Sequence, residues 1–155
     1  YLIVDTPGQI ELFAYRQSGP FFVQNFEAEE KMNLFLFDGT MVSTPSNFVS
    51  LMLLSTSIRL RLGLPTVNVI TKTDLIQEKL EQVLSWSGTD SRLEADLAGE
   101  LNGDTFSLVS DMLSSINRND FQQDMIPVSN ATGDGMVNLQ SALSRTINLG
   151  EEVED

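Results

Sequence analysis

Four short apolar runs, each ended by a small or polar residue, constrain the fold of this chain more than any other feature. Continuous apolar runs without polar alternation are typical of strands that are covered on both faces. The segments between the runs carry apolar residues at helical spacing, so strands and helices alternate, which predicts a parallel sheet with right-handed crossovers. The four predicted strands are residues 1–4, 34–37, 66–70 and 125–128.

Helices are expected between these strands. Thr44 and Pro45 are typical of an N-cap and a first helical residue, and Gly63 is typical of a helix end, so the spacing predicts a helix between them. Other helices are expected before and after the break at Gly19-Pro20, over 75–84, from Asp104 onward and over 135–147. We interpret residues 76–119 as a helical insertion, because no strand-forming segment stands out there.

Composition narrows the class of protein. The chain has 155 residues, 41% of them hydrophobic, which is enough for one modest core. It has no cysteine and no histidine, which excludes a disulfide framework and catalysis by histidine. A net charge of −13 argues against direct nucleic-acid binding, which needs basic surfaces. Residues 150–155 are interpreted as a solvated acidic tail after a partial domain over 1–149.

The sequence shows no membrane signal. No apolar run approaches the roughly 20 residues that a membrane-spanning helix needs. A charged segment followed by an apolar leader is also not visible. We therefore expect no membrane association and a cytoplasmic location.

The first motif is Asp-Thr-Pro-Gly-Gln at residues 5–9, directly after an apolar run. At the end of a strand, the Asp5 carboxylate can hold Mg²⁺ through water, because magnesium keeps part of its hydration shell. Gly8 lets its backbone N–H approach a γ-phosphate, and Gln9 can orient the attacking water. An ordinary strand-end turn is the alternative, but the later motifs favour a DxxG phosphate-sensing segment.

The second motif is Thr71-Lys72-Thr73-Asp74, which follows the third apolar run. The two carboxylate oxygens of Asp74 can accept hydrogen bonds from N1–H and the exocyclic amine of guanine. The Lys72 stem can lie along the plane of the base. Thr71 stands where the NKxD motif has asparagine, so the support given by that amide is in doubt. The alternative is a solvated lysine and an aspartate that only caps a helix.

A third, weaker motif follows the last strand. Ser129-Asn130-Ala131 occupies the place of a SAK-type loop, in which a backbone N–H reads the guanine oxygen. Asn130 and Ala131 depart from the usual Ala-Lys, and a plain turn is the alternative. Asp38-Gly39 also ends a strand; it could line the site, but we favour a turn.

A phosphate-cradling loop GxxxxGK[ST] is not present, because no glycine of this sequence is followed by lysine. The chain also starts at Tyr1 within a predicted strand. We therefore expect the sheet to be incomplete, with the first strand and the P-loop preceding this sequence.

Together these segments resemble a GPN-loop GTPase of archaeal type. The resemblance rests on residues 1–11, on Pro45 with Phe-Val-Ser at 48–50, and on Leu-Arg-Leu-Gly-Leu-Pro at 60–65 before residues 71–75. It covers most of the chain and is weakest over 77–120. It implies a P-loop NTPase-like α/β fold, GTP and GDP as ligands with Mg²⁺, and homodimers with nucleotide sites near the interface.

The resemblance also implies individual roles. Asp5 would serve the magnesium shell, Gly8 the γ-phosphate and Gln9 the water, whereas Lys72 and Asp74 would serve guanine. Glu11 matches an acidic residue of the family, and its role stays open between site and helix cap.

The sequence thus predicts a GTP-binding and GTP-hydrolysing switch protein, with the 155-residue portion inactive by itself. An ATPase of the ParA or metal-chaperone type is the alternative within the same fold. A nucleotide-free interaction or dimerisation domain is the alternative from another class. The sequence does not indicate a protein partner.

Overall fold

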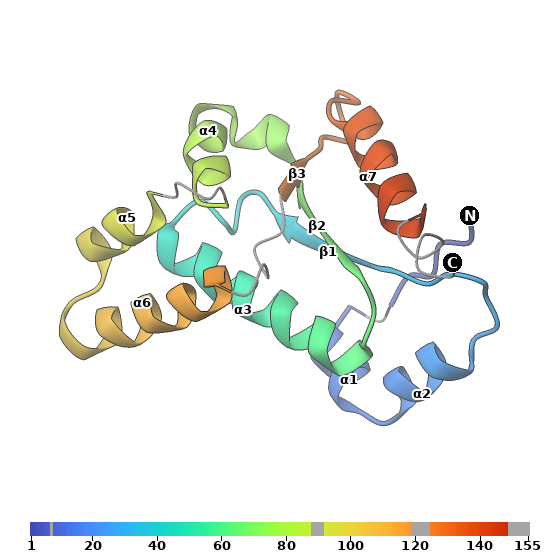
Figure 1. Ribbon diagram of the computed structural model, residues 1–155. Helices are drawn as coiled ribbons and strands as arrows, with labels where there is room; N and C mark the ends of the chain where they lie inside the picture. Colours follow the sequence, from blue (N-terminus) through green and yellow to red (C-terminus); the bar gives the residue numbers. More distant parts are fainter. Residues whose placement is uncertain (7, 88–91, 119–124, 149–155) are drawn as a thin grey trace.

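The computed structural model describes residues 1–6, 8–87, 92–118 and 125–148 (Figure 1). Its helices and strands alternate as expected along most of the chain. In chain order they are α1 (Ile10–Tyr15), α2 (Ser18–Asn25), β1 (Asn33–Asp38), α3 (Pro45–Leu62), β2 (Thr66–Thr71), the 3₁₀ helix η1 (Thr73–Leu75), α4 (Gln77–Ser85), α5 (Leu93–Glu100), α6 (Gly103–Arg118), β3 (Met125–Pro127) and α7 (Met136–Asn148).

The three strands form a parallel sheet in the order β1-β2-β3. In its register, Asp38 lies beside Thr71, and Ile70 lies beside Pro127, so all three strands end at one edge. The prediction of a parallel sheet flanked by helices is confirmed. The last strand is one residue shorter than expected, because Val128 already belongs to the loop that follows β3.

The central strand β2 is covered on both faces, which explains its unbroken apolar sequence. Val67 and Val69 pack in one cluster with Met136 and Leu139 of α7. Ile70 belongs to the larger cluster on the opposite face, which includes residues of α3. On that face the Ser55 hydroxyl of α3 also donates to Asn68 Oδ1 at 2.7 Å, which satisfies a buried amide of the strand.

The strand predicted over residues 1–4 is wrong for the described structure. Tyr1 is 94% exposed and Ile3 is 90% exposed, and the sheet pairs only β1 with β2 and β2 with β3. A strand exists only where a neighbour accepts its backbone hydrogen bonds, and residues 1–4 have no such neighbour among the described residues. In the described part of the chain β1 is therefore an edge strand. Its Leu36 side chain is 57% exposed on one face of the sheet.

Helix α3 begins and ends as its sequence predicts. The Thr44 hydroxyl accepts from Asn47 N at 3.4 Å, Pro45 is the first helical residue, and Gly63 has the left-handed φ of 66° that ends the helix. Other boundaries differ from prediction. The helix after the Gly19-Pro20 break begins at Ser18, and the one expected from residue 75 is split into η1 and α4.

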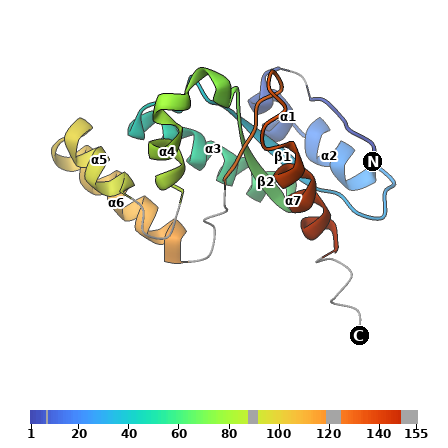
Figure 2. The ribbon, with the colours of Figure 1, turned by 90° about the horizontal axis from the view of Figure 1, so that it is seen from above.

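Helices α4, α5 and α6 lie between β2 and β3 in sequence, and Figure 2 shows α5 and α6 extending away from the sheet. Trp86 at the end of α4 packs edge-to-face against Phe48 of α3, with ring centroids 5.5 Å apart. Its indole N–H donates to Asp96 Oδ2 of α5 at 2.7 Å. The helix expected from Asp104 onward is α6, which begins one residue earlier at Gly103, so Asp104 lies in its first turn.

Membrane insertion finds no support among the described helices, since none of them combines the length and the apolar character that crossing a bilayer requires.

Candidate functional site

The polar residues that follow the three strands gather at the carboxyl edge of the sheet. Asp38 ends β1, Thr71 ends β2, and Ser129 follows β3 after Val128. Loops at the carboxyl edge are the usual ligand-binding position in open α/β sheets. Two backbone bonds tie them together: Gly39 N–H donates to the Thr71 carbonyl at 2.9 Å, and Thr73 N–H donates to the Val128 carbonyl at 3.3 Å.

The Asp74 carboxylate is held by Ser129, so the structure brings the second and third motifs together. The buried Ser129 hydroxyl donates to Asp74 Oδ1 at 2.6 Å. Within the described part of the chain, no donor is recorded on Asp74 Oδ2. The Ser129 hydroxyl orients the carboxylate, and because Asp74 is only partly buried, the carboxylate remains accessible from solvent. Such an arrangement suits a group that recognises a pair of N–H donors.

The loop that carries Ser129 is closed by its own hydrogen bonds. Ser129 N–H donates to the Asp134 carbonyl at 3.0 Å, and Gly133 N–H donates to the Ser129 carbonyl at 2.9 Å. The Thr132 hydroxyl also donates to Asp134 Oδ2 at 2.7 Å. The predicted site residues Asn130 and Ala131 stand exposed at the tip of this loop. Both residues therefore lie at the same edge of the sheet as Asp74.

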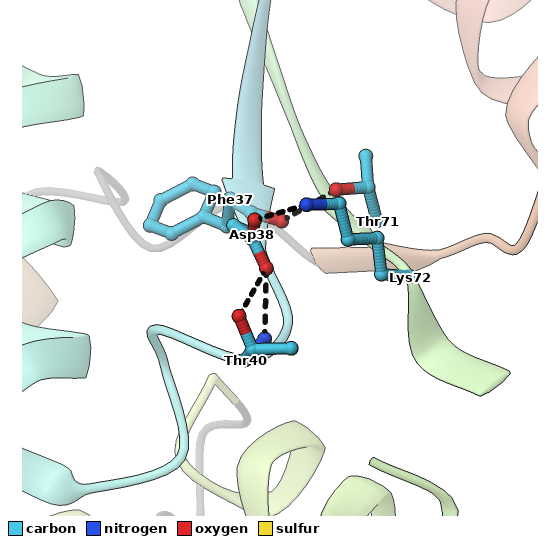
Figure 3. Close-up of polar contacts among 5 residues, drawn as sticks. All are labelled: Phe37, Asp38, Thr40, Thr71 and Lys72. Atoms are coloured by element: carbon cyan, nitrogen blue, oxygen red, sulfur yellow. Dashed lines mark hydrogen bonds and ion pairs between the residues drawn. The ribbon is translucent and has the colours of Figure 1, made fainter. Parts of the chain in front are cut away.

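Lys72 takes an unusual backbone conformation and a charged partner. Its φ is 56°, which makes it the sole non-glycine residue with positive φ in the part of the chain that the structure describes. This left-handed conformation costs about 1–2 kcal/mol for a residue with a side chain. Figure 3 shows the Lys72 ammonium group directed at the Asp38 carboxylate, with Nζ 2.6 Å from Oδ2.

Sequence reasoning favoured a turn at Asp38, and the structure shows that it also contacts a predicted site residue. Its Oδ1 accepts the Thr40 backbone N–H at 2.9 Å and the Thr40 hydroxyl at 2.7 Å (Figure 3). The hydrogen bond from Lys72, followed by that from the Thr40 side chain, lowers the pKa of Asp38 below its usual 3.8. The available signal was its position, because an aspartate ending one parallel strand lies beside the end of the next.

Thr71 occupies the position of the asparagine in the NKxD motif, and its side chain forms a hydrogen bond to the neighbouring strand. The hydroxyl donates to the Phe37 carbonyl of β1 at 3.1 Å (Figure 3). Next to it, Gly39 approaches so closely that an added Cβ would lie 2.6 Å from the Thr71 carbonyl oxygen. Only glycine allows this contact, so the ends of β1 and β2 are joined without space for a side chain.

A hollow of about 500 Å³ opens beside Asp74. One wall is the loop after β1, represented by Thr40 and Ser43, and the other is residues 74–79. Its volume lies within the range of roughly 300–1,000 Å³ that small-molecule sites occupy. The loop after β1 therefore lines the same space as the segment that carries Asp74.

The first motif lies apart from this edge. Asp5, Gly8 and Gln9 are exposed, and Pro7 lies outside the described residues. Gln9 precedes α1 without capping it through its side chain, and the position of the Glu11 side chain is not described. In Figure 1 the segment that leads into α1 runs from the right of the view down to α1, whereas α4 lies at the upper left. Among the described residues, no cluster of three or more acidic, cysteine or histidine side chains suits a metal ion.

Comparison with known proteins gives a consistent result. The model of a family described as "Conserved hypothetical ATP binding protein" matches residues 1–149. GPN-loop GTPase 1 of Saccharomyces cerevisiae is 30% identical over 94% of this chain and 40% of its own length. GPN-loop GTPase QQT2 of Arabidopsis thaliana is 30% identical over 88% of this chain and 35% of its own length. GPN-loop GTPase 3 of Eremothecium gossypii is 26% identical over 99% of this chain and 59% of its own length.

A solved structure shares the fold. The crystal structure of a GTPase in apo form from Pyrococcus abyssi superposes with a TM-score of 0.75 at 22% identity, covering 92% of this chain and 56% of that one. The chain thus spans from about a third to three fifths of these relatives. With a family model matched over almost its whole length, and relatives named for one family, the chain belongs to the GPN-loop GTPase family, whose matching model carries the description of a conserved hypothetical ATP binding protein.

Proposed function

We propose that the protein binds and hydrolyses GTP, and that this chain supplies its guanine-reading edge. The observation that carries the proposal is the Asp74 carboxylate, which the Ser129 hydroxyl holds at 2.6 Å beside a hollow at the carboxyl edge of the sheet. Each carboxylate oxygen has two lone pairs, so Oδ1 can bind Ser129 and a ligand together. The relatives' names support the same nucleotide.

Guanine fits this edge better than adenine for a chemical reason. Guanine presents N1–H and an exocyclic amine side by side, and a carboxylate can accept both hydrogen bonds. Adenine has an acceptor at the matching ring nitrogen, which a carboxylate repels. The exposed backbone at Asn130 and Ala131 would serve the guanine oxygen, and Thr71 would support the segment through its bond to Phe37.

The phosphate side of the reaction would involve the first motif. Gly8 would bring its backbone N–H to the γ-phosphate, because a glycine has no side chain that obstructs this approach. Gln9 would orient the water. Asp5 fits Mg²⁺ as one exposed carboxylate, because this ion takes one or two protein carboxylates and completes its shell from phosphates and water. When bound, Mg²⁺ would neutralise phosphate charge.

We also propose that the intact protein acts as a cytoplasmic homodimer. The family resemblance supports this assembly, with nucleotide sites near the dimer interface. The residues that cradle the α- and β-phosphates would come from outside the 155 residues, because no Gly-Lys pair occurs in this sequence.

ATP is the second candidate, because the matching family is described as ATP binding. Asp74 discriminates between the two bases. In the full-length protein, Asp74→Asn should weaken GTP binding and improve binding of xanthosine triphosphate, whose base carries a carbonyl in place of the exocyclic amine. Calorimetric titration of wild type and variant with GTP, XTP and ATP measures this exchange.

The control is Asp104→Asn, which makes the same charge change in the first turn of α6, on an exposed residue. It should leave all three affinities unchanged. An unaltered ratio of GTP to XTP affinity in Asp74→Asn would remove Asp74 from base recognition. Tighter binding of ATP than of GTP by the wild type would favour the ATPase, and binding of neither would favour a nucleotide-free interaction domain.

A further inference from the structure

The Asp38 carboxylate connects two segments that flank the candidate site. Oδ2 receives the Lys72 ammonium group at 2.6 Å, so it contacts the base-reading segment. Oδ1 receives the backbone N–H and the hydroxyl of Thr40, which lines the hollow beside Asp74. Figure 3 shows both sets of bonds on one side chain. The Asp38 carboxylate therefore connects Lys72 with Thr40, which lines the hollow.

Stability does not account for this pair. The Lys72 side chain is 56% exposed and that of Asp38 is 28% exposed, and ion pairs at such positions contribute little to folding. Lys72 also holds a left-handed backbone conformation that L-residues avoid, and strained residues of this kind gather at functional sites. What the pair does determine is the direction in which a long, otherwise mobile side chain extends.

The neighbouring Thr71 strengthens this interpretation. An asparagine at this place could hold the following segment through its side-chain amide, whereas the Thr71 hydroxyl donates to the Phe37 carbonyl within the sheet. Asp38 pairs with Thr71 in the register of the sheet, so its carboxylate lies beside the start of the segment that follows Thr71. In this chain the neighbouring strand supplies a polar side chain that anchors the segment.

Building on the proposed function, we propose that Asp38 is a positioning residue for the purine base. It holds Lys72 so that the lysine stem lies along the base that Asp74 reads, and it holds Thr40 at the wall of the same hollow. Asp38 itself does not touch the nucleotide. Its effect on affinity passes through Lys72, which makes the proposal testable by a double-mutant cycle.

The cycle uses Asp38→Asn, Lys72→Met and the double variant in the full-length protein, with GDP as the titrated ligand. The introduced asparagine keeps an oxygen for Thr40 but loses the charge, and the introduced methionine keeps an apolar stem without the ammonium group. We expect Asp38→Asn to weaken GDP binding about threefold to tenfold in the wild-type background. In the Lys72→Met background, the same change should alter the affinity by less than about twofold, because there is no ammonium group to direct.

Asp96→Asn is the matched control. Asp96 is also a hydrogen-bonded carboxylate with a lowered pKa, but it lies on α5 and contacts Trp86. Its substitution should leave GDP affinity unchanged. If Asp38→Asn does not fold, as thermal unfolding would show, Asp38→Glu enters the same cycle, since its longer carboxylate would displace the lysine.

The outcomes separate this proposal from the proposed function. If the wild type prefers GTP over XTP and the preference depends on Asp74, the proposed function stands. An equal loss of GDP affinity in both Lys72 backgrounds, or no loss at all, would then overturn the positioning role alone. A wild type that binds no guanine nucleotide would overturn both.

Discussion

At the scale of single residues, the site depends on very close contacts between strand ends. Gly39 lies against the Thr71 carbonyl, and its N–H donates to that same oxygen at 2.9 Å. The Asp38–Lys72 and Thr71–Phe37 bonds lie directly beside this contact. A change at Gly39 would therefore separate the strands where the site is built.

Gly39→Ala should destabilise the fold by about 1–3 kcal/mol, because its Cβ would lie 2.6 Å from a backbone oxygen that cannot rotate away. Urea unfolding measures the free energy. Gly99→Ala is the control, since a Cβ at that helical position meets no atom within 4 Å and alanine favours helix. Equal stability of the two variants would show that the strand ends can separate without cost.

Gln9 belongs to the same scale, and its role stays a prediction. In the full-length protein, Gln9→Leu should slow single-turnover GTP hydrolysis about tenfold or more and leave GTP affinity nearly unchanged. A group that orients water acts mainly in the transition state, so its loss affects the rate and not binding. If the variant hydrolysed GTP at the wild-type rate, a residue other than Gln9 would have to position the water.

At the scale of elements, prediction succeeded where local chemistry decides the outcome. Helix α3 begins after the cap at Thr44 and ends at the left-handed Gly63, as expected. The apolar runs of β1, β2 and β3 form strands. Residues 1–4 are equally apolar but have no neighbouring strand among the described residues. Strand formation depends on a partner strand, which the sequence of one segment does not reveal. The apolar composition of residues 1–4 therefore led to a wrong prediction.

The contacts of the candidate site also divide into those that strand order predicts and those that depend on the tertiary structure. Asp74 and Ser129 meet at one edge of the sheet, because the segments that carry them follow the parallel strands β2 and β3. The Asp38–Lys72 pair could not be derived, because it depends on the register of β1 with β2 and on a left-handed lysine. Secondary-structure propensity predicts neither the register nor the left-handed conformation of Lys72, because the tertiary structure imposes both.

The contact between α4 and α5 should weaken in acid. The hydrogen bond from the Trp86 indole, followed by that from Gln82, lowers the pKa of Asp96 below its usual 3.8. A lowered pKa stabilises the folded state above the unfolded value, and this stabilisation is lost as pH falls through the folded value. Asp96→Asn should therefore differ more from wild type at pH 5 than at pH 3.

Urea unfolding followed by fluorescence of Trp86, the lone tryptophan of the sequence, measures both stabilities. A difference between wild type and Asp96→Asn that does not shrink in acid would contradict an ionised Asp96 at this contact. The Asp104→Asn variant provides the control for the loss of one negative charge.

At the scale of the whole molecule, charge and an unpaired edge determine how the 155-residue chain behaves alone. Its net charge of −13 repels a nucleoside triphosphate, and it contains no Gly-Lys pair to offset that repulsion at the phosphates. Among the described residues one side of β1 has no partner strand, and the Leu34 and Leu36 side chains are exposed on one face of this strand. Edge strands with exposed apolar side chains invite association between chains.

The isolated chain should therefore bind GTP only weakly and should self-associate. Leu36→Lys should reduce the association, because a charged side chain on an edge strand disfavours pairing with another strand. Sedimentation velocity measures association, and titration with a fluorescent GTP analogue and Mg²⁺ measures binding. Submicromolar affinity of the isolated chain would reveal a phosphate site within these residues, and an unchanged sedimentation profile for Leu36→Lys would exclude association through β1.

The double coverage of β2 has a further consequence, which concerns hydrogen exchange. Its amides lie between two paired strands and under helices on both faces, so they should exchange last, at the free energy of global opening. The segment that carries Lys72 and Asp74 follows directly from this strand, whereas Asp5, Gly8 and Gln9 are exposed and should exchange within seconds. A nucleotide bound through both Asp74 and Gly8 would slow exchange mainly at Gly8, where reduced deuterium uptake would report contact with the γ-phosphate.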